Sequence, residues 1–125
     1  MNIERQIIFH DHHFQDFYLE QTEKVREKIG YVFRVIKTVD KIPEKFLKHL
    51  DGTDGLYEIR IELGSNIYRV FCCFDEGNLV VLFNGFQKKT QKTPRQEIQM
   101  AQKLKTEYFK LKIKGNEKRQ SDKKR

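Results

Sequence analysis

The chain of 125 residues is 38% hydrophobic and 34% charged, and it carries a formal charge of +7 at pH 7. This length and apolar share fit one domain with a single modest core and exclude a chain built of several domains. Residues 112–125 hold seven basic and two acidic residues, which is +5 of the +7, so the rest of the chain carries only +2. Because a basic polar tail binds polyanions without specificity, the net charge alone does not indicate a nucleic-acid site.

The sequence predicts neither export nor a membrane anchor. The first residues, MNIERQIIFHDHH, are charged where a signal peptide has an apolar core, and no apolar run approaches membrane-spanning length. Cys72 and Cys73 are neighbours in a predicted strand, so their side chains point to opposite faces and are poorly placed to bridge each other. We therefore expect a cytoplasmic protein with two buried thiols and no membrane partner.

The N-terminal part predicts a strand followed by two helices. Residues 3–9 form the strand, and Asp11 is a candidate cap for a first helix that carries Phe14, Phe17 and Tyr18. A longer helix begins near Thr22, because apolar residues then recur at the spacing of one helical face: Val25, Ile29, Val32, Ile36 and Val39. The two helices are expected to pack as a hairpin on a sheet, since neither can bury its apolar stripe alone.

The middle of the chain predicts an antiparallel meander. After Pro43, the segment EKFLKHL is expected to form one or two helical turns. Three strand-like runs follow, at residues 57–63, 67–74 and 79–86, separated by the turn sequences LGSN and DEGN. The first alternates between apolar and charged residues, while the third is almost uniformly apolar, as in a strand covered on both faces.

The C-terminal part predicts one helix and a tail. Thr93 and Pro94 fit the N-cap and first helical positions, and the apolar stripe is assigned to Met100, Leu104, Tyr108 and Leu111. We expect the domain to span residues 1–111, and the basic tail, residues 112–125, to be disordered. The predicted fold class is α+β: an N-terminal strand and helical hairpin, a three-stranded antiparallel meander and a C-terminal helix, with the helices on one face of the sheet.

Five cations on or beside the meander are the candidates for chemistry: Arg60, Arg69, Lys88, Lys89 and Lys92. Each has a simple structural interpretation. Arg69 could extend to water from a sheet edge, and Arg60 could join an ion ladder with Glu58 and Glu62. The three lysines could simply form a solvated face. If the helices cover one face, however, the other face gathers these groups and Glu58 in a small area. Guanidinium and ammonium groups gathered in this way suit a phosphodiester, and Phe86 or Phe71 offers a ring on which a base could stack.

The histidines allow two interpretations. His10, His12 and His13 could bind a metal together with Asp11, but at a strand-to-helix junction such residues ordinarily act as exposed caps. His49 is the best placed of the four to carry a proton, although a structural role is the simpler interpretation. We expect no metal and no cofactor.

The run GLYEIRI…IYRVFCCFDEGNLVVLFNGFQKKTQKTPRQEIQMA resembles the RelE/HigB superfamily of type II toxin–antitoxin toxins, closest to its phage-derived branch. The match extends from the N-terminal part to about Tyr108. The resemblance implies a cytoplasmic toxin that enters the ribosome and cuts mRNA without a metal, by attack of a ribose 2′-hydroxyl on the adjacent phosphate. It also implies a cognate antitoxin, expected to be a helix-turn-helix protein through which alone the toxin would meet operator DNA.

By position in this resemblance, Arg69 matches an arginine that holds the scissile phosphate, and Arg60 a basic residue on the neighbouring strand. Lys88 and Lys89 match the catalytic basic residues after the last strand, while Lys92, Phe86 and Glu58 are expected to bind the substrate. Glu58 stands where some members have a lysine, and no tyrosine follows the lysine loop. The general base therefore stays open between Glu58 and a lysine with a lowered pKa. Two other functions stay open as well, a gyrase-targeting toxin of the ParE type and a non-catalytic module that binds RNA or a partner.

Overall fold

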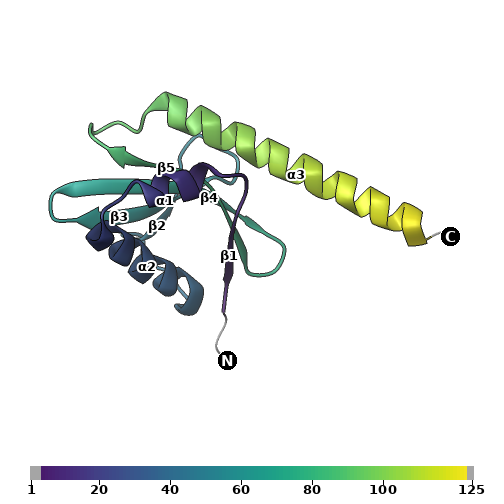
Figure 1. The fold of residues 1–125 in the computed structure, drawn as a ribbon, viewed down its shortest axis with the longest axis horizontal. Coiled ribbons are helices and arrows are strands. Elements are labelled where there is room, and N and C mark those ends of the chain that lie inside the picture. The colour runs from purple at the N-terminus through teal and green to yellow at the C-terminus, as the bar shows by residue number, and fades with distance from the viewer. Residues whose placement is uncertain (1–3, 124–125) are drawn as a thin grey trace.

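The computed structural model describes the backbone of residues 4–123 and the side chains of residues 4–115. Its elements are β1 (Gln6–Phe9), α1 (His13–Leu19), α2 (Glu23–Thr38), β2 (Leu47–His49), β3 (Tyr57–Leu63), β4 (Asn66–Asp75), β5 (Leu79–Lys88) and α3 (Arg95–Lys123). The strands form one sheet in the order β1-β5-β4-β3-β2 (Figure 1). None of the helices in the described residues is long and apolar enough to cross a membrane.

The predicted α+β class and the meander β3-β4-β5 are confirmed, but the sheet is larger than expected and mixed. β1 pairs with β5 in parallel, from Gln6 opposite Leu79 to Phe9 opposite Leu82. In the segment predicted as one or two helical turns, residues 44–46 do form a turn, in which the amides of Phe46 and Leu47 donate to the carbonyl of Pro43. Leu47–His49 instead form β2, with Lys48 opposite Glu58. The prediction was wrong for these residues because β3 would otherwise present an edge of unpaired backbone groups, and pairing outweighs the weak helical preference of so short a segment.

The hairpin of α1 and α2 covers one face of the sheet, as predicted. Thr22 caps α2, because its hydroxyl accepts a hydrogen bond from the amide of Val25. The apolar stripe of α2 is buried with Phe14 and Phe17 of α1 against alternate residues of the strands, which include Ile59, Ile61, Val70, Cys72 and Leu82. Val39 is not part of this stripe, since it lies past the helix end and is exposed.

α3 covers the opposite face, so the expectation that all helices share one face was wrong. Ala101 and Leu104 are buried there against a second group of residues, which comprises Leu56 just before β3 and the strand residues Phe71, Cys73, Val81, Phe83 and Phe86. Met100 and Leu111 of the predicted stripe are exposed. Hydrophobic period determines which residues of a helix face inward, but it does not say on which side of the sheet the helix lies.

α3 continues past residue 111 and projects beyond the sheet (Figure 1). The segment 112–123, predicted as part of a disordered tail, is helical, and residues 124–125 of that tail lie outside the described residues. Lys112 helps to attach the helix, because its Nζ lies 2.8 Å from Oδ1 of Asp75. Tyr108 donates a 2.6 Å hydrogen bond to the same carboxylate.

An irregularity in β5 changes which of its residues face which helix layer. Cys72 lies opposite Leu82 but Val70 lies opposite Gly85, so three residues of β5 span two of β4, as in a β-bulge. Gly85 therefore faces α1, where a Cβ atom would lie 2.5 Å from the ring of Phe17. The same shift places Phe86 on the α3 face.

Candidate functional site

Two arginines face each other across neighbouring strands. In the pairing of β3 with β4, Arg60 lies directly opposite Arg69, and Arg69 lies opposite Phe86 of β5. Like charges directly opposite each other destabilise a sheet, so this pair opposes folding locally. Sites where a local rule is broken without an evident structural gain are candidates for function.

Glu58 is the carboxylate that the two arginines share. Its Oε1 lies 3.5 Å from Nε of Arg60, and its Oε2 lies 3.7 Å from Nε of Arg69. Among the described residues, the Nε atoms of both arginines are buried without a hydrogen-bond partner, although Nη1 of Arg69 donates to the carbonyl of Tyr68. Glu58 is the one carboxylate within 4 Å of either guanidinium group in the described residues, although the exposed Glu62 also acts on Arg69 from further away. The buried part of this group therefore carries an excess positive charge, which suits an anion.

The two arginines differ in their access to solvent. Arg69 is 2% exposed, whereas the side chain of Arg60 is 28% exposed. Burial lowers the pKa of Arg69 below its ordinary value and Arg60 adds to this effect, while the carboxylates of Glu58 and Glu62 oppose it. Arg60 is therefore the member of the pair that a ligand can reach directly, and Arg69 supplies positive charge behind it.

Phe86 and Phe71 are not free to stack on a base in this arrangement. Their ring centroids lie 5.4 Å apart, and both residues are buried under α3. They form the apolar floor next to Arg69 rather than an open platform.

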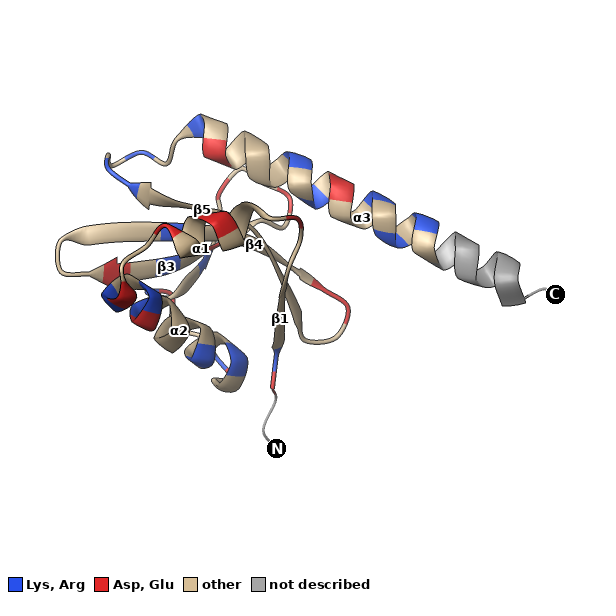
Figure 2. Ribbon diagram, in the orientation of Figure 1, with Lys and Arg blue, Asp and Glu red and all other residues tan. Residues whose placement is uncertain are grey.

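Three lysines lie where β5 ends and the loop to α3 begins. Lys88 is half-buried, while Lys89 and Lys92 are exposed. Since Lys88 follows Phe86 on the same face, it lies one step of roughly 7 Å along β5 from the row that holds Arg69. A hollow of about 560 Å³ lies here, lined by Ser65, Ile67, Lys88, Lys89, Thr90 and Gln91. Figure 2 shows the basic residues of this loop beside the β3–β4 turn.

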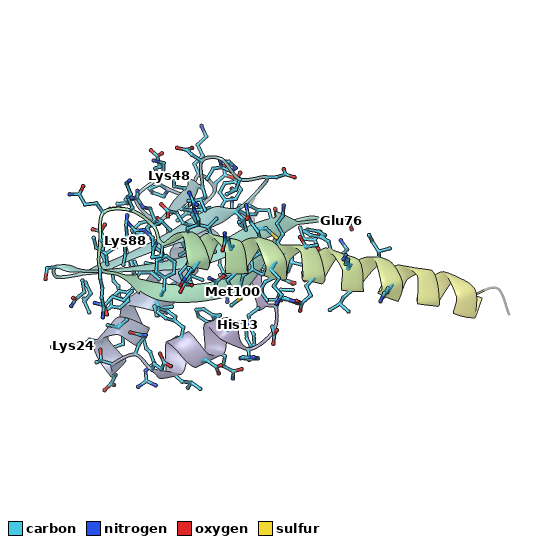
Figure 3. The ribbon with its side chains drawn as sticks, turned by 90° about the horizontal axis from the view of Figure 1, so that it is seen from above. His13, Lys24, Lys48, Glu76, Lys88 and Met100 are labelled. Carbon is cyan, nitrogen blue, oxygen red and sulfur yellow. The ribbon has the colours of Figure 1, made fainter. Side chains whose placement is uncertain are left out.

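Three cations near Arg60 were not among the residues predicted from the sequence. Lys48 of β2 lies directly opposite Glu58, so it shares the face that carries the arginines. Lys28 of α2 and Lys45, which precedes β2, line a second hollow of about 420 Å³ together with Arg60 and the acidic Glu62. No pattern in the sequence links these lysines to the arginines, because β2 was interpreted as helix and the pairing of the sheet edge was not foreseen. Lys48 and Lys88, both labelled in Figure 3, are not neighbours, because β4 and β3 lie between their strands in the sheet.

Asn84 was also missed, although it fixes α3 above this site. It is buried on the α3 face, where its Nδ2 donates to the backbone carbonyl of Glu97 at 3.1 Å and to Oε2 of Glu97 at 2.9 Å. Its Oδ1 is buried without a hydrogen-bond partner in the described part of the chain. The sequence feature that could have indicated its role is that Asn84 is the one amide side chain within the apolar run of residues 79–86 in β5.

The remaining candidate, His49, lies on the other face. It is opposite Tyr57, whose ring lies 5.2 Å from the His49 ring and belongs to the core under α2. His49 is thus separated by the sheet from Arg60 and Arg69.

Comparison with protein families matches residues 16–106 to the family described as phage derived protein Gp49-like (DUF891). The chain belongs to this family. The match spans β2 to β5 and therefore includes Glu58, both arginines and the lysine loop. Gp49-like proteins are a RelE/HigB-like toxin family whose members are commonly the toxins of toxin–antitoxin pairs, which implies a cognate antitoxin as partner. No curated protein matches the chain.

Proposed function

We propose that this Gp49-like protein is a ribosome-dependent mRNA interferase, the toxin of a type II toxin–antitoxin pair. The observation that carries the proposal is the facing pair Arg60–Arg69, which shares the single carboxylate of Glu58. A scissile phosphate carries one negative charge, which would neutralise the excess positive charge of this group. Membership of a toxin family makes RNA the natural source of that phosphate.

The proposed reaction is cleavage by the RNA itself. The 2′-oxygen of the ribose forms a bond to the adjacent phosphorus, and its proton passes to a base. The bond from phosphorus to the 5′-oxygen then breaks, and this oxygen takes up a proton. The products are a 2′,3′-cyclic phosphate and a free 5′-hydroxyl, and the proposed step requires neither an oxidant nor a metal.

In this reaction, Arg60 would bind a non-bridging phosphate oxygen, and Arg69 would stabilise the charge that develops in the transition state. Fixed positive charge aimed at a developing oxyanion is commonly the largest single contribution to catalysis. Arg69 suits this role although it is buried, because a charge in a poorly solvated site is screened less than one in water.

The remaining candidates have supporting roles in the proposal. Lys88, Lys89 and Lys92 would bind phosphates that flank the scissile bond, and Lys48 would add to the same field. Phe86 would support Arg69 from below. The general base is either Glu58, which already contacts both arginines, or Lys88 at the end of β5.

Induced expression in a bacterial host tests this function. We expect wild-type protein to stop growth and to leave new 5′ ends within translated mRNA, detected by primer extension. Arg60→Gln should remove both effects, whereas Arg34→Gln, which removes the same charge from the exposed face of α2, should retain them. Growth arrest with intact mRNA and with cleaved DNA trapped on gyrase would instead support a gyrase-targeting toxin. Ribosome binding without arrest would support a non-catalytic module.

A further inference from the structure

We propose that Asp11, His12 and His13 bind a divalent transition metal of the Zn²⁺ class at the junction of β1 and α1. The inference is independent of the proposed RNA cleavage. Imidazole nitrogen and carboxylate oxygen are ligands that Zn²⁺ prefers in proteins. The three residues each offer one ligand atom, and these atoms all lie within 4.8 Å of one another.

The separations of these atoms are close to those around a bound ion. Nε2 of His12 lies 3.6 Å from Oδ1 of Asp11, and Nε2 of His13 lies 3.7 Å from Oδ2 of the same carboxylate. Ligands at about 2.0–2.1 Å in a tetrahedral shell are about 3.3 Å apart. Small rotations of exposed side chains would therefore bring the three atoms to bonding distance.

The backbone brings these side chains to one place. Asp11 has a φ of 64°, and it is the one non-glycine residue with positive φ among those the structure describes. This conformation turns its carboxylate over the start of α1, where Oδ1 accepts a 2.8 Å hydrogen bond from the amide of His12. The rings of His12 and His13 stack with centroids 4.4 Å apart, so two successive residues present their imidazoles side by side.

Asp16 holds His12 in the form that binds metal. Its Oδ2 lies 2.7 Å from Nδ1 of His12, so the proton of the neutral ring is held on Nδ1 and the lone pair is left on Nε2. A carboxylate that orients a metal-binding histidine in this way is the usual outer partner of such a ligand. Asp16 is therefore a positioning residue of the proposed site.

The site is separate from the arginines and from the other possible ligands. The amide of His10 bonds to Leu82 of β5, whereas Arg69 lies opposite Phe86, four residues or roughly 13 Å further along that strand. Figure 3 shows His13 on another part of the molecule from Lys48 and Lys88. His10 itself is engaged with Glu107 at 3.4 Å.

Titration of the untagged full chain with Zn²⁺ tests the proposal by calorimetry, with the visible spectrum of Co²⁺ as a second probe. We expect one ion per chain, and at least a ten-fold loss of affinity in His12→Ala and in His13→Ala. His49→Ala is the matched control, because it removes an exposed histidine outside the site, and its affinity should equal that of the wild type.

Nuclear magnetic resonance of the histidine rings assigns the ligands without relying on a variant. Zn²⁺ should shift Nε2 of His12 and His13 and leave the ring of His49 unchanged. Asp16→Ala should weaken binding about 10–100-fold and shift His12 toward the other tautomer, with the thermal melting curve unchanged. The proposal is overturned if the wild type binds no stoichiometric ion, or if His12→Ala and His13→Ala bind as tightly as it does.

Discussion

Glu58 and Arg69 form a buried ion pair on the face of the sheet that α3 covers, with Nε and Oε2 3.7 Å apart. The same carboxylate also contacts Arg60, so one buried acidic residue pairs with two cations on neighbouring strands. This relationship links the stability of the meander to the proposed chemistry, because the group that holds the arginines in place is also a candidate base.

Glu58→Gln removes the charge between the arginines while it keeps the shape of the side chain. We expect the free energy of unfolding to fall by about 3 kcal/mol, because removing one partner of a buried pair leaves an uncompensated buried charge. Urea unfolding measures this change. The control is Glu27→Gln on the exposed face of α2, where the change should stay within about 0.5 kcal/mol. Equal effects of the two substitutions would contradict a special role for Glu58.

Gly85→Ala tests the close approach of α1 to β5. The added Cβ would lie 2.5 Å from the ring of Phe17, and we expect a loss of about 1–3 kcal/mol in the free energy of unfolding. Phe17→Leu in the same chain should recover part of this loss by making room for the methyl group.

Gly30→Ala is the matched control for this substitution. No atom lies within 4 Å of a Cβ built at Gly30, which is in the middle of α2, so alanine there should stabilise the protein by up to about 1 kcal/mol. Opposite signs for the two substitutions are expected, and a neutral Gly85→Ala would show that the bulge in β5 is not packed as described.

Asp75 predicts a pH dependence of stability. Burial alone raises the pKa of this carboxyl, but hydrogen bonds from Lys112, Tyr108 and the amide of Glu76 outweigh it and hold the pKa below the ordinary 3.8. A carboxyl whose pKa is lower in the folded than in the unfolded protein stabilises the fold at pH values above its unfolded pKa. This contribution is lost as the pH falls through its folded pKa. Tyr108→Phe should therefore destabilise the protein at pH 7, and the difference from wild type should shrink below about pH 4. A difference that is constant from pH 7 to pH 3 would argue against this role of Asp75.

The lysine loop predicts a change in the salt dependence of RNA binding. If Lys89 contacts one phosphate, Lys89→Gln should reduce the slope of log affinity against log salt concentration by about 0.7 for a single strand. Lys103→Gln on the exposed side of α3 is the control and should leave the slope unchanged. Fluorescence anisotropy with a short single-stranded RNA measures both, and an unchanged slope in Lys89→Gln would remove Lys89 from the interface.

Local patterns allowed the meander and the helical hairpin to be predicted, because alternation along β3 and the apolar stripe of α2 each extend over several turns or pleats. β1 and β2 are only four and three residues long, so neither their pairing nor the parallel direction of β1 could be read from them. The side of the sheet that α3 covers depends on the direction in which the loop after β5 leaves the sheet, and hydrophobic periodicity gives no information on that direction. The uniformly apolar run of β5 also hid the bulge, since a change of face alters no pattern there.

The candidate site was predictable in part for the same reasons. Alternation placed Glu58 and Arg60 on one face, and the register of β4 then brought Arg69 opposite Arg60. The position of Lys48 and the hydrogen bonds from Asn84 to Glu97 could not be predicted, because they depend on contacts between residues distant in the sequence. The burial of Phe86 could not be predicted because it depends on the position of α3. Catalysis by the arginines and lysines remains a prediction.

Cleavage of ribosome-bound mRNA by purified protein is the most direct test of the proposed function. Wild-type protein should produce fragments with a 2′,3′-cyclic phosphate and a free 5′-hydroxyl. Arg60→Gln and Arg69→Gln, each shown by circular dichroism to be folded, should reduce the rate at least 100-fold, while Arg34→Gln should cleave at the wild-type rate. Undiminished cleavage by folded Arg60→Gln and Arg69→Gln, or no cleavage by the wild type, would contradict the account.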